Sequence, residues 1–394
     1  MQEQDPRRWL VLGVGLVGLI AGCAAQYGLA YLIPAFRAEG RSLEEATLFV
    51  SAPIVGIVLT LIAWGAAADR WGERLVLVAG LAGAGACLLA AAAVDGTLAR
   101  LVLLFGVGAT SSAIHAASGR LILGWFAARQ RGLAMGIRQM GQPLGIGVAA
   151  VVLPPVAATG VGASLSFLGV ACLASATLIL LLVRDPPRPA RRAGDPAPVS
   201  PYREPYLWRI HLASTLLVVP QVTVAVFAFD FLVTALGWSI TDAGVLLAVT
   251  ALLGAGGRLL AGHWSDRVRS RLGPMRIVAA VIGLSMVALA LSAVAGIGPT
   301  VAALAVAVVV TVSPNGLAFT AVAERAGSAW AGRALGVQNT FQNLVAGAAT
   351  PPLAVLIGLA GGGPTGYGLA FATVALLPFL AALAVPARQE RRAD

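Results

Sequence analysis

The chain has 394 residues, of which 58% are hydrophobic and 11% charged, and its mean hydropathy is +0.87. So little polar surface excludes a water-soluble globule and places the chain in a lipid bilayer. The net charge of +10 comes from arginine alone, without lysine, and no basic face interleaved with aromatic residues is present, so the composition does not indicate a nucleic-acid partner.

A membrane-spanning helix needs about 20 apolar residues, and the chain supplies twelve such segments. They cover residues 9–36, 46–67, 75–94, 98–125, 132–157, 162–183, 207–236, 241–262, 275–297, 299–323, 332–358 and 365–385. The sequence LIAGC at 19–23 is similar to a lipoprotein signal box, but the apolar run continues to Phe36, so we interpret it as the first span. The pattern predicts an all-α polytopic membrane protein.

One long polar segment, rich in proline and arginine, interrupts the spans at 184–206. We interpret it as a cytoplasmic linker between a six-helix bundle at 1–183 and a second one at 207–394. Most arginines lie on the side of this linker and the termini, whereas Arg37, Arg41 and Arg100 lie on the other side. This asymmetry predicts a multi-pass protein of the cytoplasmic (inner) membrane with both termini in the cytoplasm.

The two halves repeat one another in sequence. A shift of 197 residues pairs Gly40 with Gly237, Ser42 with Ser239, Ala46 with Ala243, Gly65 with Gly262, Asp69 with Asp266 and Arg70 with Arg267. After a loop that is three residues longer in the second half, a shift of 200 pairs Gly132 with Gly332, Gly136 with Gly336 and Gln142 with Gln342. Two parallel six-helix repeats are typical of one large class of transporters.

The stretch GAAADRWGER resembles the signature that the major facilitator superfamily carries between helices 2 and 3. The matching residues are Gly65, Asp69, Arg70, Gly72 and Arg74, and Glu73 stands where the family has a basic residue. GHWSDR is similar to the weaker copy between helices 8 and 9, with Gly262, Asp266 and Arg267. The resemblance covers the whole chain and implies the twelve-helix fold of that family.

The signature loop has a physical interpretation as a gating latch. Gly65 allows two helices to approach closely, and Asp69 can accept hydrogen bonds from the N–H groups that begin the facing helix, for which GRALGV from Gly332 is the expected partner. We expect Arg70 and Arg74 to pair with acidic groups or carbonyls of the other half. The alternative is that these charges only fix topology. In relatives a carboxylate at the end of helix 4 often completes the network, whereas this chain has Arg120 there.

Ionisable residues inside spans are costly and are therefore functional candidates. They are His115, Arg120, Arg138, Asp230 and Arg258. GRLLAGHWSDR resembles helix 8 of the monocarboxylate and oxalate porters, which implies that Arg258 binds a substrate carboxylate. The block from Trp125 resembles helices 4 and 5 of nitrate and cyanate porters. For Arg120 the alternative is a residue of the latch, or one whose charged end reaches the cytoplasmic surface.

Polar residues at mid-depth complete the candidate substrate site. They are Gln26, Gln142, Gln221, Asn315, Asn339, Gln342 and Asn343, together with His115 and Arg138. Side chains that converge from several helices are what a solute site between two repeats requires, although a single amide can also serve as interhelical packing. Asp230, in the outer half of its span, is the candidate for proton coupling, with a static partner of an arginine or tyrosine as the alternative.

Cys23, Cys87 and Cys172 lie in apolar runs at unrelated spacings, so neither a metal site nor disulfides are expected. Without a Walker loop or a Ser-His-Asp arrangement, the sequence indicates neither an enzyme nor an ATP-driven pump, and no cofactor. We expect a monomeric secondary active transporter in the lipid bilayer that moves a small organic anion such as a carboxylate by alternating access, with proton coupling as a hypothesis. The alternatives are a drug/proton antiporter and a membrane sensor or scaffold without transport.

Overall fold

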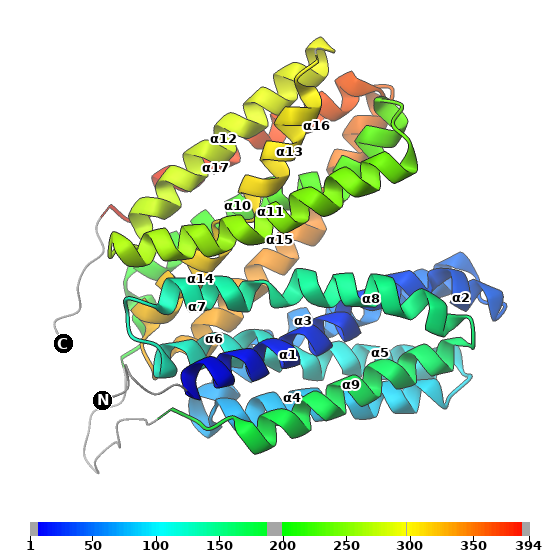
Figure 1. The fold of residues 1–394 in the computed structure, drawn as a ribbon, viewed down its shortest axis with the longest axis vertical. Helices are drawn as coiled ribbons and strands as arrows, with labels where there is room; N and C mark the ends of the chain where they lie inside the picture. The colour runs from blue at the N-terminus through cyan, green and yellow to red at the C-terminus, as the bar shows by residue number, and fades with distance from the viewer. Residues whose placement is uncertain (1–6, 187–198, 297, 388–394) are drawn as a thin grey trace. The chain divides into compact units, whose positions relative to one another are not determined.

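The computed structural model describes residues 7–186, 199–296 and 298–387 (Figure 1). Over these ranges the regular elements are helices without a β-strand, and 12 helical segments are long and apolar enough to cross a membrane. The predicted all-α fold is confirmed. The central part of the predicted linker, 187–198, lies outside the described residues.

Contacts along the chain define two compact units. Unit 1 comprises Met1–Ala127, Ile137–Val199 and Ala326–Thr340. Unit 2 comprises Ala128–Gly136, Ser200–Arg325 and Phe341–Asp394. Each unit therefore contains most of one half of the sequence together with a short segment of the other half. The helices that cross from one unit into the other are α7 (Arg131–Gln139) and α15 (Ala331–Leu359).

Unit 1 is a bundle in which α4 packs against α9, α3 against α5, and α1 against α8 and α9 (Figure 1). Its helices are α1 (Arg7–Tyr27), the 3-10 helix η2 (Gly28–Leu32), α2 (Ile33–Ala38), α3 (Leu43–Trp71), α4 (Glu73–Ala92), α5 (Thr97–Ser111), α6 (Ala113–Trp125), α8 (Gly141–Ala157) and α9 (Val161–Leu182). In α4 the buried residues Leu77, Leu81, Ala84 and Leu88 recur every three to four positions, so one face of the helix forms the core.

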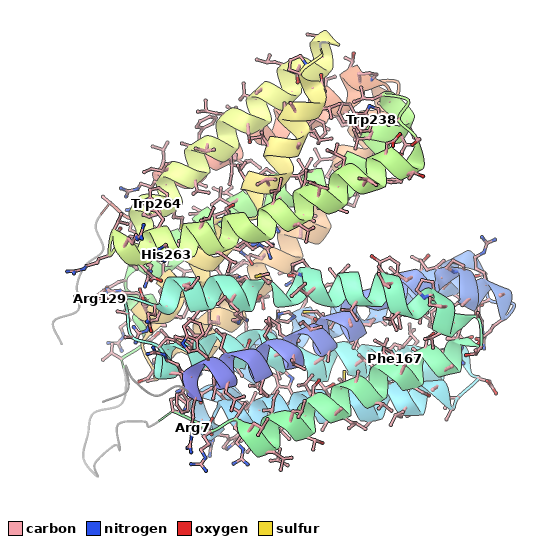
Figure 2. The ribbon with its side chains drawn as sticks, viewed as in Figure 1. Arg7, Arg129, Phe167, Trp238, His263 and Trp264 are labelled. Carbon is pink, nitrogen blue, oxygen red and sulfur yellow. The ribbon has the colours of Figure 1, made fainter. Side chains whose placement is uncertain are left out.

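Unit 2 is a second bundle, in which α12 packs against α13 and α16, α10 against α17, and α11 against α13. Its helices are the 3-10 helix η3 (Pro201–Arg203), α10 (Pro205–Asp230), the π-helix η4 (Phe231–Ala235), α11 (Ile240–Arg267), α12 (Leu272–Ala295), α13 (Thr300–Thr311), α14 (Asn315–Ala326), α16 (Pro364–Ala375) and α17 (Leu377–Ala384). Figure 2 shows α11 running along the whole unit, with Trp238 near its first turn and His263 and Trp264 near its last.

Large apolar side chains remain on the outside of both units. Phe167 on α9, labelled in Figure 2, is 42% exposed, and Leu252 on α11 is 73% exposed. An exposed apolar surface of this extent is unfavourable in water and favourable against lipid. The surface therefore agrees with the membrane location that the composition predicts.

The sequence repeat is reproduced in the backbone. Gly40 and Gly237 both have positive φ angles, of 84° and 72°, which an L side chain rarely adopts. Two residues later, Ser42 and Ser239 cap α3 and α11, because each side chain accepts a hydrogen bond from the N–H three residues further on, at 3.1 and 3.0 Å. Equivalent residues in the two halves thus form the same turn and the same helix start.

Spans 4 and 10 are both broken at equivalent positions. Span 10 breaks between α13 and α14, where Pro314 cannot donate a backbone hydrogen bond. Span 4 breaks at Ser112 without a proline. Here Thr60 and Trp64 of α3 donate to the Ala109 carbonyl at 2.8 and 2.6 Å, and side chains that insert into a helical ladder in this way are a known cause of kinks.

Prolines within the spans differ in their effect. Pro378 is the second residue of α17, after a break in span 12, and Pro143 follows the break between α7 and α8. Pro53 and Pro220 lie inside the continuous helices α3 and α10. A proline in a span therefore does not by itself determine where the helix is interrupted.

Candidate functional site

Asp69 caps the first turn of α15 inside unit 1. Its two carboxylate oxygens accept hydrogen bonds from the N–H groups of Gly332 and Arg333, at 2.8 and 3.0 Å. The first N–H groups of a helix have no intrahelical acceptor and carry partial positive charge, so a carboxylate there is stabilised twice. The contact that the sequence predicts between Asp69 and GRALGV is therefore present.

Arg120 and Glu73 extend this contact into a buried network. The Arg120 guanidinium lies 3.0 Å from Glu73 Oε1 and 3.4 Å from Asp69 Oδ1. It also donates to the carbonyl oxygens of Ser328, at 3.0 Å through Nε, and of Ala68. Arg120 and Glu73 are 4% and 1% exposed, so the arginine does not extend to the surface. We call Asp69, Glu73 and Arg120, together with the contacts that Asp69 and Arg120 make to residues 328–333, the N latch.

Two glycines allow the helices of the N latch to meet. A Cβ atom on Gly65 would lie 2.6 Å from the carbonyl carbon of Gly332 and closer still to its oxygen, and a Cβ on Gly332 would lie 2.7 Å from Asp69 Oδ1. Any side chain at either position would therefore push the backbones of α3 and α15 apart. One turn further along, Gly336 lies against the backbone of Leu61 in the same way.

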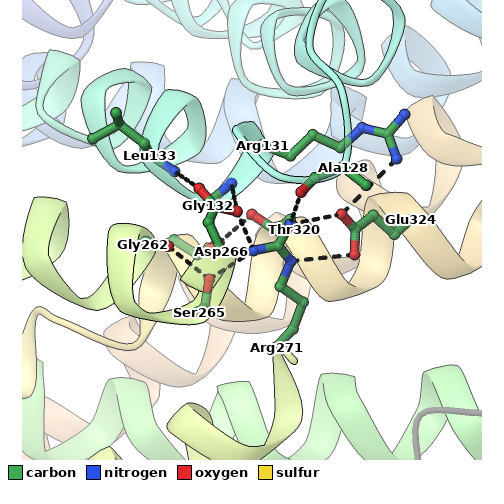
Figure 3. A network of polar contacts seen from close by, with 11 residues as sticks. Ala128, Arg131, Gly132, Leu133, Gly262, Ser265, Asp266, Arg271, Thr320 and Glu324 are labelled. Atoms are coloured by element: carbon green, nitrogen blue, oxygen red, sulfur yellow. Dashed lines mark hydrogen bonds and ion pairs between the residues drawn. The ribbon is translucent and has the colours of Figure 1, made fainter. Parts of the chain in front are cut away.

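Unit 2 contains the equivalent arrangement around Asp266 (Figure 3). Asp266 accepts hydrogen bonds from the N–H groups of Gly132 and Leu133, at 3.0 and 2.9 Å, in the first turn of α7. A Cβ atom on Gly262 would lie 2.7 Å from the carbonyl carbon of Gly132, which is the same close approach as between Gly65 and Gly332. The weaker signature copy therefore makes the same helix-capping contact as the stronger one.

Arg271 is the cation of this second network. Its guanidinium donates to Ser265 Oγ at 2.7 Å, to Asp266, to the Ala128 carbonyl and to Glu324 Oε1 at 3.0 Å. Burial opposes the charged form, but Glu324 and Asp266 together outweigh it, so the pKa of Arg271 is raised above its ordinary value. We call the contacts of Asp266, Arg271 and Glu324 with residues 128–133 the C latch.

The remaining signature residues lie at the edges of these networks. Arg74 donates from Nε to the Leu180 carbonyl at 3.1 Å, and its backbone N–H donates to Asp185 at 2.8 Å, so its described contacts are within its own half of the sequence rather than across to the other. Arg70 is exposed and lies over the Trp71 ring at 5.8 Å. Gly72 has a φ of 105° and ends α3, and Arg267 is exposed at the end of α11.

Unit 1 also contains a buried polar cluster at the break of span 4. Gln26 is fully buried, donates to Ser111 Oγ at 2.8 Å, and its Oε1 lies 2.8 Å from His115 Nε2. Arg138 donates to the His115 carbonyl at 2.6 Å and to Ser118 Oγ at 2.8 Å. The fold thus brings together Gln26, His115 and Arg138, three of the predicted site residues.

Arg258 occupies the corresponding region of unit 2. It is 8% exposed, and its Nε donates to the Val312 carbonyl at 3.2 Å, at the break between α13 and α14. Asn315, the first residue of α14, donates to Gln221 Oε1 of α10 at 3.1 Å. Arg258, Gln221 and Asn315 therefore lie on three elements that are close to or part of the broken span.

The predicted amides of α15 and α8 are in different environments. Gln342 is buried and donates to Ser214 Oγ of α10 at 2.6 Å, whereas Asn339 donates to the Leu335 carbonyl of its own helix at 2.8 Å. Asn343 is half-buried and Gln142 is exposed. Thus Gln342 makes an interhelical hydrogen bond of the kind that holds spans together, and Asn339 satisfies its own helix.

Asp230 ends α10, directly before the π-helix η4. Tyr367 of α16 donates a hydrogen bond to the Asp230 carboxylate, and the Thr234 hydroxyl lies 3.3 Å from the same tyrosine oxygen and donates to the Asp230 carbonyl at 2.6 Å. Asp230 itself is exposed, and Tyr367 is buried. The tyrosine partner that the sequence left as an alternative is therefore present at this carboxylate.

Metal binding finds no support in the part of the chain that the structure describes, where no group of three or more histidine, cysteine or acidic side chains could hold an ion. Cys23, Cys87 and Cys172 are free thiols.

Comparison with known proteins decides the family. Residues 14–351 match the family model described as Major Facilitator Superfamily. The chain belongs to the major facilitator superfamily. This superfamily member is 42% identical over 384 residues to an uncharacterized MFS-type transporter of Mycobacterium tuberculosis. The aligned region covers 97% of this chain and 85% of the relative. The chain is 28% identical over 257 residues to a probable nitrate/nitrite transporter of the same species, with 63% of each chain covered.

Solved structures share the fold of this superfamily member. The human organic anion transporter MFSD10 has a TM-score of 0.73 at 18% identity, covering 97% of this chain and 100% of that one. The Escherichia coli fucose:proton symporter has a TM-score of 0.72 at 18% identity, covering 95% and 99%. Both the fold class and the family predicted from the sequence are thus confirmed.

Sequence reasoning missed several residues of this transporter's latches. Glu73 was noted only as a departure from the family signature, yet it is one of two carboxylates that Arg120 contacts. Arg271 and Glu324 were not singled out, because neither belongs to the signature copy GHWSDR. The sequence feature that could have drawn attention to Arg271 is the loop after Asp266, which is three residues longer than its counterpart in the first half.

Proposed function

We propose that this transporter is a secondary active carrier that moves a small organic anion, of the carboxylate class, across the cytoplasmic membrane by alternating access. The observation that carries the proposal is Arg258, a buried guanidinium in the second half of α11 that is bonded to the Val312 carbonyl at a helix break. Ionisable side chains inside a span mark substrate or ion pathways by default.

The surroundings of Arg258 favour an anion. A guanidinium stays charged and offers two parallel N–H donors, which match the two oxygens of a carboxylate. The break that Arg258 reaches is followed by the start of α14 at Asn315, and a helix start attracts negative charge through its N–H groups. The Asn315–Gln221 hydrogen bond supplies amide groups that can orient a bound solute.

Further support comes from the second buried guanidinium and from the relatives. Arg138 lies with His115 and Gln26 in unit 1, and we assign this cluster to substrate binding. Two of the proteins that this chain resembles are named as transporters of anions, one of nitrate and nitrite and one of organic anions. An anionic solute is the class of substrate that these names and the buried arginines have in common.

We assign gating to the N latch and the C latch. In each, an aspartate caps the first turn of a helix and a guanidinium binds the segment just before that helix. Alternating access requires such contacts to form in one phase of the cycle and to break in another. The arginine-rich segments on the side of the termini support a cytoplasmic location for that side.

Asp230 is our candidate for proton coupling. Its carboxylate is held by Tyr367 next to a π-helical turn, and such turns occur frequently at functional sites. A carboxylic acid that binds a proton on one side and releases it on the other couples transport to the proton gradient. Each charge moved contributes about 2.3 kcal/mol per 100 mV of membrane potential.

The test of the anion proposal is ligand-induced thermal stabilisation in detergent. A panel of mono- and dicarboxylates should include at least one compound that stabilises the parent protein, by about 2.7 kcal/mol at one hundred times its dissociation constant. Arg258→Ala should abolish this stabilisation, and Arg258→Lys, which keeps the charge but loses the fork, should weaken it. Arg209→Ala is the matched control, because Arg209 also donates to a backbone carbonyl, that of Ala384, at 2.9 Å, but outside the candidate site.

The outcome distinguishes a carrier of organic anions from a carrier of lipophilic cationic drugs. Stabilisation by a carboxylate in the parent and in Arg209→Ala, but not in Arg258→Ala, supports the proposal. Stabilisation by lipophilic cations with no response to any carboxylate contradicts it, as does a carboxylate response that Arg258→Ala leaves unchanged.

A further inference from the structure

In the N latch and the C latch, the guanidinium and the second carboxylate are supplied by different parts of the chain. In the C latch the guanidinium is on the loop residue Arg271 and the second acid is Glu324, on α14 (Figure 3). In the N latch the second acid is Glu73, the first residue of α4 after the loop, and the guanidinium is Arg120, on α6. Thr320 stands at the position that corresponds to Arg120 under the shift of 200 residues.

Both guanidiniums nevertheless make the same three kinds of contact. Each touches the capping aspartate, and each pairs with a second carboxylate at 3.0 Å. Each also donates to a backbone carbonyl in the segment that enters the capped helix, and these carbonyls belong to Ser328 and Ala128, which are equivalent under the same shift. The two halves therefore place a guanidinium at the same point from two different positions in the sequence.

We propose that Glu73 and Arg120 are an exchanged ion pair, which performs in the N latch the task that Arg271 and Glu324 perform in the C latch. Arg120 is a positioning residue: it holds Asp69 in its capping orientation and ties the segment Ala326–Thr340 to the rest of unit 1. What the latch requires is a guanidinium at this point with a carboxylate beside it, and either the loop or the helix can supply the guanidinium.

Burial explains why the two charges depend on each other. The side chains of Glu73 and Arg120 are 2% and 5% exposed, so reversal of one charge alone would leave like charges together with little solvent to screen them. Reversal of both charges would restore a pair and would give the N latch the arrangement of the C latch. The bond from Arg120 to Ser328 is specific to the present arrangement, so the reversed pair should be close to the parent but not identical to it.

The test measures latch opening directly, without any solute. Cys23, Cys87 and Cys172 are replaced by serine, and Ala334, a fully buried residue in the first turns of α15, is changed to cysteine. The rate of maleimide labelling at this position reports how often Ala326–Thr340 separates from the rest of unit 1. This proposal rests on the proposed gating role only for its effect on transport. Because the labelling experiment uses no solute, its result does not depend on whether the anion proposal is correct.

We expect R120E and E73R each to raise the labelling rate by about tenfold or more, and the double variant E73R/R120E to return it to within about threefold of the parent. Arg100→Gln is the matched control. Arg100 is a buried arginine at the other end of the same span, paired with Glu39 at 3.2 Å and bonded to the Val94 carbonyl, so its loss should affect stability without changing labelling at position 334.

Two results would overturn the proposal: single reversals that label at the parent rate, or a double reversal that labels as fast as the faster single one. If a single reversal does not yield folded protein, recovery of monodisperse protein becomes the measurement. In that case E73R/R120E must restore folding, and a double variant that is as poorly folded as the single ones contradicts the exchange.

Discussion

Replacement of Gly65 by alanine tests whether close contact between α3 and α15 is what makes the N latch possible. The added Cβ would lie 2.6 Å from the carbonyl carbon of Gly332, whereas ordinary contact between such atoms is about 3.5 Å. Backbone atoms occupy both sides of this contact, so no side-chain rotation relieves it. The first turn of α15 must move away from α3 by about 1 Å.

The displacement acts on the Asp69 cap. The bonds from Gly332 N–H and Arg333 N–H, at 2.8 and 3.0 Å, would lengthen to about 4 Å, beyond hydrogen-bonding distance. Each hydrogen bond to a charged group contributes about 1.5–3 kcal/mol. The higher helix propensity of alanine does not offset this loss, because position 65 stays inside α3 whether the latch is closed or open. The N latch should therefore weaken by about 3–6 kcal/mol.

Maleimide labelling of Ala334→Cys in the cysteine-free background measures this change, because a weakening of about 1.4 kcal/mol corresponds to a tenfold larger open population. We expect Gly65→Ala to raise the labelling rate by at least about tenfold. Gly13→Ala is the matched control, because Gly13 lies in α1 of the same unit and a Cβ there would meet nothing within 4 Å. Parent-like labelling in Gly65→Ala would show that the helices tolerate separation without losing the cap.

Two further changes probe the other candidate groups. Asp266→Asn removes the charge from the cap of α7 and from the pair with Arg271, so we expect labelling of a cysteine at the buried position Ala134 to rise by about tenfold, and a rate equal to that of the parent would contradict the capping role. Asp230→Asn removes the candidate proton carrier, so solute transport in proteoliposomes should lose its dependence on the pH gradient. An unaltered pH profile would assign Asp230 and its hydrogen bond from Tyr367 to structure instead.

Prediction succeeded where a local pattern had a single physical solution. Apolar runs of about 20 residues have no stable environment other than a bilayer or a buried helix, so the number of spans and their approximate ends followed from composition. The repeat also paired Gly40 and Ser42 with Gly237 and Ser239, and the structure has the same turn and the same helix cap at both places. The contact of Asp69 with the start of α15 followed from the chemistry of a carboxylate near uncapped N–H groups.

Prediction was weaker where a residue's role depends on its neighbours in space. For Arg74 the sequence suggested a partner in the other half, and the described contacts are to Leu180 and Asp185. The break in span 4 has no proline, and what accompanies it is a pair of donors from α3 that bond to the Ala109 carbonyl. Gln142 was grouped with Gln342 by the repeat, yet the first is exposed and the second is buried against Ser214.

The sequence by itself determined that this is a twelve-span, duplicated membrane protein and identified its family, because hydropathy, repeat spacing and a ten-residue signature are properties of the chain taken in order. Only the tertiary structure decided that Glu73 and Arg120, 47 positions apart, are partners, and that Ser328 completes their network. Pairing of charges depends on which atoms lie within about 4 Å of each other, and that proximity is created by helix packing.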